Sequence, residues 1–116
     1  MSDWPTPKRG DVWWADLRDS WGQRPVVLLA RNDAYQSLTW VMVAPTSTRL
    51  RQLATALILD PDTDPVPKRC TLLLDHVQSV RQEWLVEPIG SLSEERMTAV
   101  DLALHLSLGI ETCPTR

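Results

Sequence analysis

Residues 25–30 read PVVLLA, six apolar residues in a row that follow Arg24 and precede the polar segment 31–33 (RND). An uninterrupted apolar run of this length, containing β-branched valine, is typical of a strand that is covered on both faces. We therefore expect residues 25–30 to lie at the centre of the protein core.

Further strand-like segments flank this central run. Residues 11–17 (DVWWADL) and 39–44 (TWVMVA) are rich in β-branched and aromatic residues, which favour strands. We expect Pro45 to end the second of them, because proline has no N–H group to donate to a neighbouring strand. Three more strands are expected at residues 54–59, 71–74 and 77–80.

The connections carry turn-forming residues. Segment 18–23 (RDSWGQ) contains Gly22 and is predicted to form a turn between the first two strands. Residues 60–68 (DPDTDPVPK) hold three prolines and three aspartates. They cannot continue a strand ladder, so an exposed loop is predicted there.

The hydrophobic pattern changes period near the C-terminus, where apolar residues recur at helical spacing and predict one helix after the strands. The recurring residues are Met97, Val100, Ala103, Leu104 and Leu108. Ser93 is placed to cap the start of this helix, and Glu94 and Glu95 suit the positive end of its dipole. Gly109 is placed to end it.

Short strands followed by one helix indicate a mainly β protein, folded as a small, strongly bent β-barrel or half-open sheet with a C-terminal helix packed on it. The chain has 116 residues, of which 43% are hydrophobic and 23% charged, so we expect a single domain over residues 1–116. Most of the six tryptophans are expected in the core, because the chain has no phenylalanine.

Neither a membrane span nor a disulfide framework is predicted. No apolar run approaches the roughly 20 residues that a bilayer requires, and the first ten residues are polar and proline-rich. We therefore expect a cytoplasmic protein without membrane contact. Cys70 and Cys113 lack the spacing of a zinc knuckle or a redox pair, so both are expected to be reduced thiols.

The charge pattern bears on nucleic-acid binding. A net charge of −3 counts against a general binder of phosphates, which relies on clustered Lys and Arg. Up to Ile58, however, there are seven basic and five acidic residues (+2), and from Leu59 onward five and ten (−5). The basic residues therefore lie mostly in the first half of the chain.

Five ordered segments resemble one protein family from end to end. They are 8–17 (KRGDVWWADL), 24–33 (RPVVLLARND), 41–49 (VMVAPTSTR), 71–80 (TLLLDHVQSV) and 89–110 (IGSLSEERMTAVDLALHLSLGI). The sequence is similar to the MazF/PemK/ChpB toxins of type II toxin–antitoxin systems. The resemblance implies an SH3-like β-barrel with a C-terminal helix, and a homodimer with an RNA groove across its interface. It also implies a growth-inhibiting endoribonuclease (mRNA interferase) that cuts single-stranded RNA with no metal or cofactor.

The resemblance also implies a catalytic pair. In the family, an Arg directly before a Pro at the start of the second strand acts with a Thr or Ser at the end of the third. These positions match Arg24 and Thr46. Several family members have one more apolar residue after the third-strand proline, and that alignment would give the role to Ser47. We take Thr46 as the first choice and Ser47 as the alternative.

Four neighbouring residues are candidate RNA contacts: Trp21, Gln23, Arg49 and Arg51. An exposed ring at Trp21 would be able to stack on a base or insert into an antitoxin peptide. The two arginines are placed to contact phosphates, although a solvated basic loop is an equally good interpretation. The loop 18–23 is shorter than the Gly-Ser-Glu-Gln loop usual in the family, so RNA gating and sequence preference are expected to differ.

The candidate arginine suits cleavage in which the ribose 2′-hydroxyl attacks the adjacent phosphorus. A guanidinium can donate two parallel hydrogen bonds to phosphate oxygens and keeps its charge, which stabilises the phosphorane transition state. It is a poor general base because its pKa exceeds about 12, so the base is left open. His76 and His105 offer a two-histidine mechanism, but their places after a strand and within the helical repeat favour structural roles.

Two alternatives to an RNase remain. A CcdB-like toxin of related fold poisons DNA gyrase by protein contact and would predict an aromatic-glycine ending, whereas this chain ends GIETCPTR. A catalytically silent barrel that only binds a partner is the other. For the RNase, the expected partners are single-stranded RNA, a second copy of the chain and a cognate antitoxin with a disordered, acidic tail.

Overall fold

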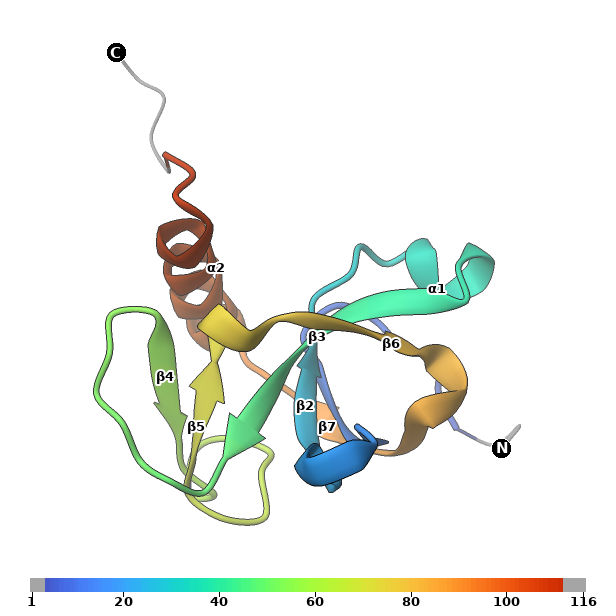
Figure 1. Ribbon diagram of the computed structural model, residues 1–116, viewed down its shortest axis with the longest axis horizontal. Coiled ribbons are helices and arrows are strands. Elements are labelled where there is room, and N and C mark those ends of the chain that lie inside the picture. Colours follow the sequence, from blue (N-terminus) through green and yellow to red (C-terminus); the bar gives the residue numbers. More distant parts are fainter. Residues whose placement is uncertain (1–3, 112–116) are drawn as a thin grey trace.

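The computed structural model describes residues 4–111, which form a seven-stranded antiparallel sheet and one long helix (Figure 1). The strands are β1 (Asp11–Asp16), β2 (Gln23–Leu28), β3 (Trp40–Ser47), β4 (Ala56–Leu59), β5 (Cys70–Leu73), β6 (Gln78–Arg81) and β7 (Leu85–Ser91). The helices are α1 (Ala34–Ser37) and α2 (Glu94–Leu108), and the 3-10 turns are η1 (Asp19–Trp21), η2 (Leu74–His76) and η3 (Gln82–Trp84).

The sheet is strongly bent and half-open, which confirms the expected fold class. Its strand order is β4-β5-β3-β2-β1-β7, with β6 paired to β3 beside this path. Since β4 and β7 stand at the two ends of the order, the barrel is not closed. The predicted central run is confirmed within β2, where Val26, Val27 and Leu28 are fully buried.

Strand β3 does not end at Pro45, so that prediction was wrong. The strand continues to Ser47 because Pro45 falls where β3 changes neighbours. Along one edge, β6 pairs with β3 as far as Val43, and β5 takes over from Thr46. Pro45 lies between the β6 pairing and the β5 pairing, where neither strand needs a hydrogen bond from its backbone nitrogen. Strands tolerate proline at such positions.

Strand β7 was missed because Pro88 and Gly90 interrupt its sequence. It lies at the end of the strand order and pairs with β1 through two register shifts, where the ladder is irregular enough to accept Pro88. Gly90 is required by close packing, since a Cβ atom at this position would lie 2.6 Å from Cβ of Pro65.

Two clusters of buried side chains occupy opposite faces of the bent sheet. Neighbouring residues such as Val26 and Val27 belong to different clusters, as the alternation of side chains along a strand requires. One cluster joins the sheet to α2 through Val12, Val27, Ala44, Leu59, Leu72, Val100 and Ala103. The other contains Trp13, Val26, Leu28, Val41, Val43 and Val80. Figure 1 shows α2 beside β4 and β5, and α1 near β3 and β6 on the other side.

The predicted ends of α2 are confirmed. The Ser93 side chain accepts a hydrogen bond from the backbone N–H of Arg96 at 3.1 Å. At the other end Gly109 adopts a left-handed conformation with φ of 73°, and the N–H of Ile110 donates to the carbonyl of His105. Leu108 was expected on the buried face but is 57% exposed, because the last turn extends beyond the sheet.

The tryptophans do not fill the core, contrary to expectation. Among the described residues only Trp13 is buried, whereas Trp4 and Trp40 are each 48% exposed. Valine and leucine from the strands fill the interior instead, because the small space inside a bent sheet suits short branched side chains.

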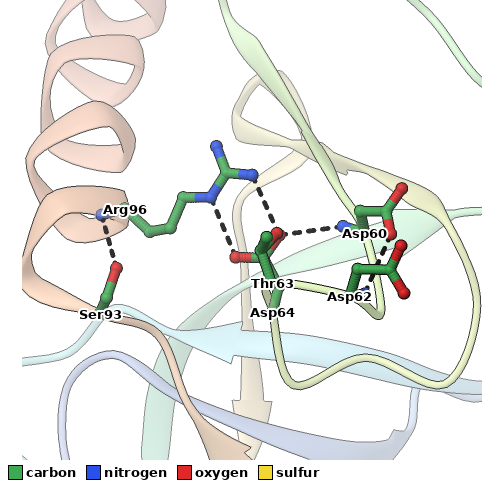
Figure 2. Close-up of polar contacts among 6 residues, drawn as sticks. All are labelled: Asp60, Asp62, Thr63, Asp64, Ser93 and Arg96. Carbon is green, nitrogen blue, oxygen red and sulfur yellow. Dashed lines mark hydrogen bonds and ion pairs between the residues drawn. The ribbon is translucent and has the colours of Figure 1, made fainter.

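The loop 60–68 is only partly exposed, because Asp64 and Val66 are buried. Figure 2 shows Arg96 of α2 donating two hydrogen bonds to the Asp64 carboxylate, at 2.9 and 3.0 Å. Burial alone would raise the pKa of Asp64, but the hydrogen bonds from Arg96 and from the backbone of Asp60 outweigh it and hold the pKa below its usual value. This ion pair fastens the loop to the helix.

In the described part of the chain, no helix is long and apolar enough to cross a membrane. Cys70 is a buried free thiol, and Cys113 lies outside the described residues.

Candidate active site

A cleft of about 470 Å³ opens where β2 begins and β3 ends, next to the start of β5. In Figure 1 these segments meet at the lower edge of the sheet, near η1 and the loop before β5. The cleft is lined by Trp14, Gln23, Arg24, Pro25, Thr46, Ser47, Thr48, Pro67, Lys68 and Cys70. Arg24 and Lys68 are the charged residues of this lining. A chain with an overall negative charge therefore presents a cationic cleft.

The Arg24 guanidinium is fixed by its surroundings. Its Nε donates to the backbone carbonyl of Trp21 at 2.9 Å, and its Nη1 donates to the carbonyl of Thr46 at 2.9 Å. Its Cζ atom lies over the Trp21 ring, 4.9 Å from the centroid. A guanidinium has five N–H donors, so three remain for a ligand after these two contacts.

Strand register separates the two candidate hydroxyls. Val26 on β2 lies opposite Pro45 on β3, and side chains two residues apart on a strand point to the same face. Arg24 and Ser47 therefore project from one face, whereas Thr46 projects from the other.

The environments of the two hydroxyls differ as well. Thr46 is 2% exposed, and its Oγ1 donates to the carbonyl of Pro25 at 2.7 Å. Ser47 is half-buried, and its Oγ accepts a hydrogen bond from the backbone N–H of Arg49 at 3.1 Å. Within the described residues the Ser47 hydroxyl donates to no acceptor, so its proton stays available to a ligand.

The sequence model of the family described as "PemK-like, MazF-like toxin of type II toxin-antitoxin system" matches residues 8–108. The chain belongs to this family. The resemblance inferred from the five sequence segments is thereby confirmed.

This toxin is 41% identical over 102 residues to a protein of Mycobacterium tuberculosis (strain ATCC 25618 / H37Rv) named probable endoribonuclease MazF5, a match covering 88% of the chain and 93% of the relative. A solved structure described as an endoribonuclease in complex with its cognate antitoxin from Mycobacterial species has a TM-score of 0.81 at 22% identity, covering 92% and 99% of the two chains. The Mycobacterium tuberculosis toxin MazF-mt6 has a TM-score of 0.78 at 27% identity, covering 87% and 98%.

The four candidate RNA contacts occupy different places in the toxin. Gln23 lines the cleft, and Trp21 lies beneath the Arg24 guanidinium. Arg49 is exposed just after β3, beside Ser47. Arg51 lines a separate, shallow hollow with Leu53, Ala56 and Ile58. Of the four, Gln23 alone lines the cleft; Trp21 and Arg49 contact the lining residues Arg24 and Ser47, and Arg51 lies outside it.

Lys68 is a cleft residue that the sequence analysis missed, because it was counted as part of an acidic loop. The antiparallel pairing of β3 with β5 brings the segment before Cys70 alongside the end of β3. The sequence carries no direct signal for this placement, which requires the strand order. Cys70 at the start of β5 also lines the cleft, and burial raises the pKa of its thiol to about 11.

The two histidines lie apart from the cleft lining. His76 ends η2, and its ring packs against Trp21 with ring centroids 5.7 Å apart. His105 lies in the last turn of α2. Within residues 4–111, no group of three or more His, Cys, Asp or Glu side chains is arranged to hold a metal ion.

Proposed function

We propose that this toxin is an endoribonuclease that cleaves single-stranded RNA in the cleft around Arg24. The observation that carries the proposal is the guanidinium of Arg24, held by two backbone carbonyls with three N–H donors left over in a cationic cleft. The name of the 41% identical relative, probable endoribonuclease MazF5, supports the same activity.

In the proposed reaction, the ribose 2′-oxygen forms a bond to the adjacent phosphorus as the bond from phosphorus to the 5′-oxygen breaks. The 2′-hydroxyl loses its proton and the departing 5′-oxygen gains one, so the products are a 2′,3′-cyclic phosphate and a 5′-hydroxyl. Arg24 stabilises the extra negative charge of the pentacoordinate phosphorane with preorganised hydrogen bonds. The protein group that takes the 2′ proton is not assigned. No metal or cofactor takes part in this scheme.

We assign the hydroxyl contact on a nonbridging phosphate oxygen to Ser47, with Thr46 as the alternative. Ser47 shares a face with Arg24 and has its hydroxyl proton free, whereas the Thr46 proton is donated to Pro25. Thr46 then has a structural role, because its backbone carbonyl holds Arg24.

Further contacts with the RNA are proposed next to Arg24 and Ser47. Gln23 and Lys68 line the cleft, so Lys68 is placed to contact a backbone phosphate and Gln23 a base or ribose. Arg49 is placed to meet the next phosphate beyond Ser47. Arg51 would contact only an RNA that runs beyond the cleft.

A homodimer is proposed as the active form. The outer face of α2 exposes Leu102 and Leu106, one helical turn apart and 52% and 53% exposed, and Ile110 beyond the helix is also exposed. Self-association would remove this apolar face from water. A mass near twice 13.2 kDa in solution is expected.

The proposed antagonist is a cognate antitoxin with a disordered, acidic tail. Charge complementarity to Arg24 and Lys68 supports a tail that competes with RNA for the cleft. The proposed place of action is the cytoplasm, where RNA substrates and such an antitoxin would meet.

Incubation of the purified toxin with a long single-stranded RNA in EDTA tests the activity. Discrete fragments with 2′,3′-cyclic phosphate ends are expected. Cleavage that requires added magnesium or zinc would contradict the metal-free scheme. Intact RNA under all conditions would instead favour a toxin that acts by protein contact.

A further inference from the structure

The turn η1 is built around a strained backbone. Arg18 has a φ of 67°, the left-handed region that non-glycine residues rarely adopt. Its guanidinium carbon lies over the Trp84 ring, 4.7 Å from the centroid, and its backbone N–H donates to the Asp16 carboxylate at 3.0 Å. The backbone N–H groups of Trp21 and Gly22 both point to the carbonyl of Arg18. These contacts hold a tight turn in one conformation.

Trp21, at the end of this turn, contacts Arg24 in two independent ways. Its carbonyl accepts the Arg24 Nε–H, and its ring lies under the guanidinium. His76 from η2 packs against the same ring, tilted by 58°. Trp21 thus contacts both Arg24 and His76, and the three residues come from β2, η1 and η2.

We infer that Trp21 is a positioning residue for Arg24, and that the RNA-cleaving site depends on its ring to hold the guanidinium in the cleft. The expected effect on RNA cleavage rests on the proposed function. The contacts between Arg24 and Trp21 do not depend on that function. A guanidinium on an aromatic face is held by cation–π attraction and loses side-chain freedom. Transition-state stabilisation depends on donors that are already in place, so looser donors lower the rate rather than the affinity.

The alternative role for Trp21, stacking on an RNA base, fits the contacts less well. One ring face is covered by Arg24, and the ring is half-buried and packed on the core cluster of Val26 and Val41. Base stacking requires an open ring face. The two roles predict different kinetic effects, so they can be separated.

The test compares Trp21→Ala, Trp21→Leu and Trp21→Phe. Cleavage of a fluorescent single-stranded RNA at saturation should fall about tenfold in Trp21→Ala and Trp21→Leu and less than about threefold in Trp21→Phe, which keeps an aromatic face. Affinity for the same RNA with a 2′-deoxy substitution at the cut site should change less than about twofold. Trp4→Ala is the matched control, because Trp4 is 48% exposed and is not part of the cleft lining, and it should keep the wild-type rate.

A second readout does not depend on RNA. The Arg24 Nε–H signal in a ¹H–¹⁵N NMR spectrum, assigned by its loss in Arg24→Lys, should be shifted by the Trp21 ring current and protected from exchange. In Trp21→Leu, a variant that fills space without a ring, the ring-current shift is lost by construction, so the informative quantity is exchange. If the ring positions the guanidinium, the Nε–H should exchange faster even though the Trp21 backbone carbonyl that accepts it remains. In the Arg24→Ala background, Trp21→Ala should add no further loss of rate.

Exchange protection of the Arg24 Nε–H that is unchanged in Trp21→Leu overturns the inference, as does loss of RNA affinity with an unchanged saturated rate, which would establish stacking on RNA. If the NMR signal responds as expected while the wild-type toxin cuts no RNA, the positioning role is supported and the proposed function is rejected.

Discussion

The backbone carbonyl of Thr46 accepts a hydrogen bond from Nη1 of Arg24 at 2.9 Å, which ties the start of β2 to the end of β3. The position of Arg24 therefore depends on the backbone of β3 as well as on its own strand. Substitutions of the Thr46 side chain leave this carbonyl in place, so the contributions of the two residues can be tested separately.

Arg24→Ala should lower the cleavage rate at saturating RNA by about 100-fold or more, because removal of one preorganised donor commonly has this effect. RNA affinity should fall much less. Arg24→Lys should recover little activity, since an ammonium cannot donate in two directions within one plane. Single-turnover cleavage measures the rate, and a wild-type rate in Arg24→Ala would show that Arg24 is only a surface cation.

Ser47→Ala should lower the saturated rate more than Thr46→Val does. The Ser47 hydroxyl shares a face with Arg24, whereas the Thr46 hydroxyl is buried against Pro25. Thr46→Val loses one buried hydrogen bond and should instead reduce the free energy of unfolding by about 1 kcal/mol. Parallel rate and urea-unfolding measurements decide the assignment, and the opposite ranking of rates would return the catalytic role to Thr46.

Lys68→Ala should weaken RNA binding and reduce the slope of log affinity against log salt concentration by about one, as expected for one lost phosphate contact. The saturated rate should change less than the affinity. Arg69→Ala is a matched control, because Arg69 is the adjacent cation but pairs loosely with Asp60 at 3.7 Å and is not part of the cleft lining. Equal effects of the two substitutions would mean that Lys68 acts only through net charge.

The features of the fold that local patterns encode were predicted correctly. The apolar run in β2 and the caps Ser93 and Gly109 each act within a few residues, so they can be identified from sequence. Strand β7 and the passage of β3 through Pro45 depend on which strands lie alongside, and that information is not local.

The residues of the candidate site also fall into those that sequence can indicate and those that only the strand order brings together. Arg24 and the two hydroxyls were proposed through the resemblance, and their catalytic roles stay predictions, whereas Lys68 was missed because strand order brings it to the cleft. The choice between Thr46 and Ser47 also required the register, since sequence alone does not give the face from which each side chain projects.

Cys70 should react slowly with iodoacetamide in the folded toxin. Burial raises the pKa of its thiol from 9.0 to about 11, so the reactive thiolate should be about 100-fold rarer at pH 8 than in the unfolded chain. The rate should be measured in Cys113→Ser, which leaves one thiol, with the same protein in urea as the reference. Native labelling as fast as unfolded labelling would contradict the burial of Cys70.

The Asp64–Arg96 pair should make stability fall in acid. Hydrogen bonds hold the pKa of Asp64 below its ordinary value of 3.8 in the folded state. A carboxyl group with a lowered pKa contributes stability that is fully present above the unfolded pKa and is lost as pH falls through the folded pKa. Asp64→Asn should therefore lower the free energy of unfolding by about 1–3 kcal/mol at pH 7, and the difference from wild type should shrink towards pH 3.

Asp62→Asn provides the control for this prediction. It removes an exposed carboxylate from the same loop, which Figure 2 shows apart from the Arg96 guanidinium. Its effect on unfolding should be within about 0.5 kcal/mol at both pH values. Urea unfolding of the three proteins at pH 7 and pH 3 gives the comparison. A gap between wild type and Asp64→Asn that stays constant from pH 7 to pH 3 would mean that shape, rather than the charge of Asp64, fastens the loop to α2.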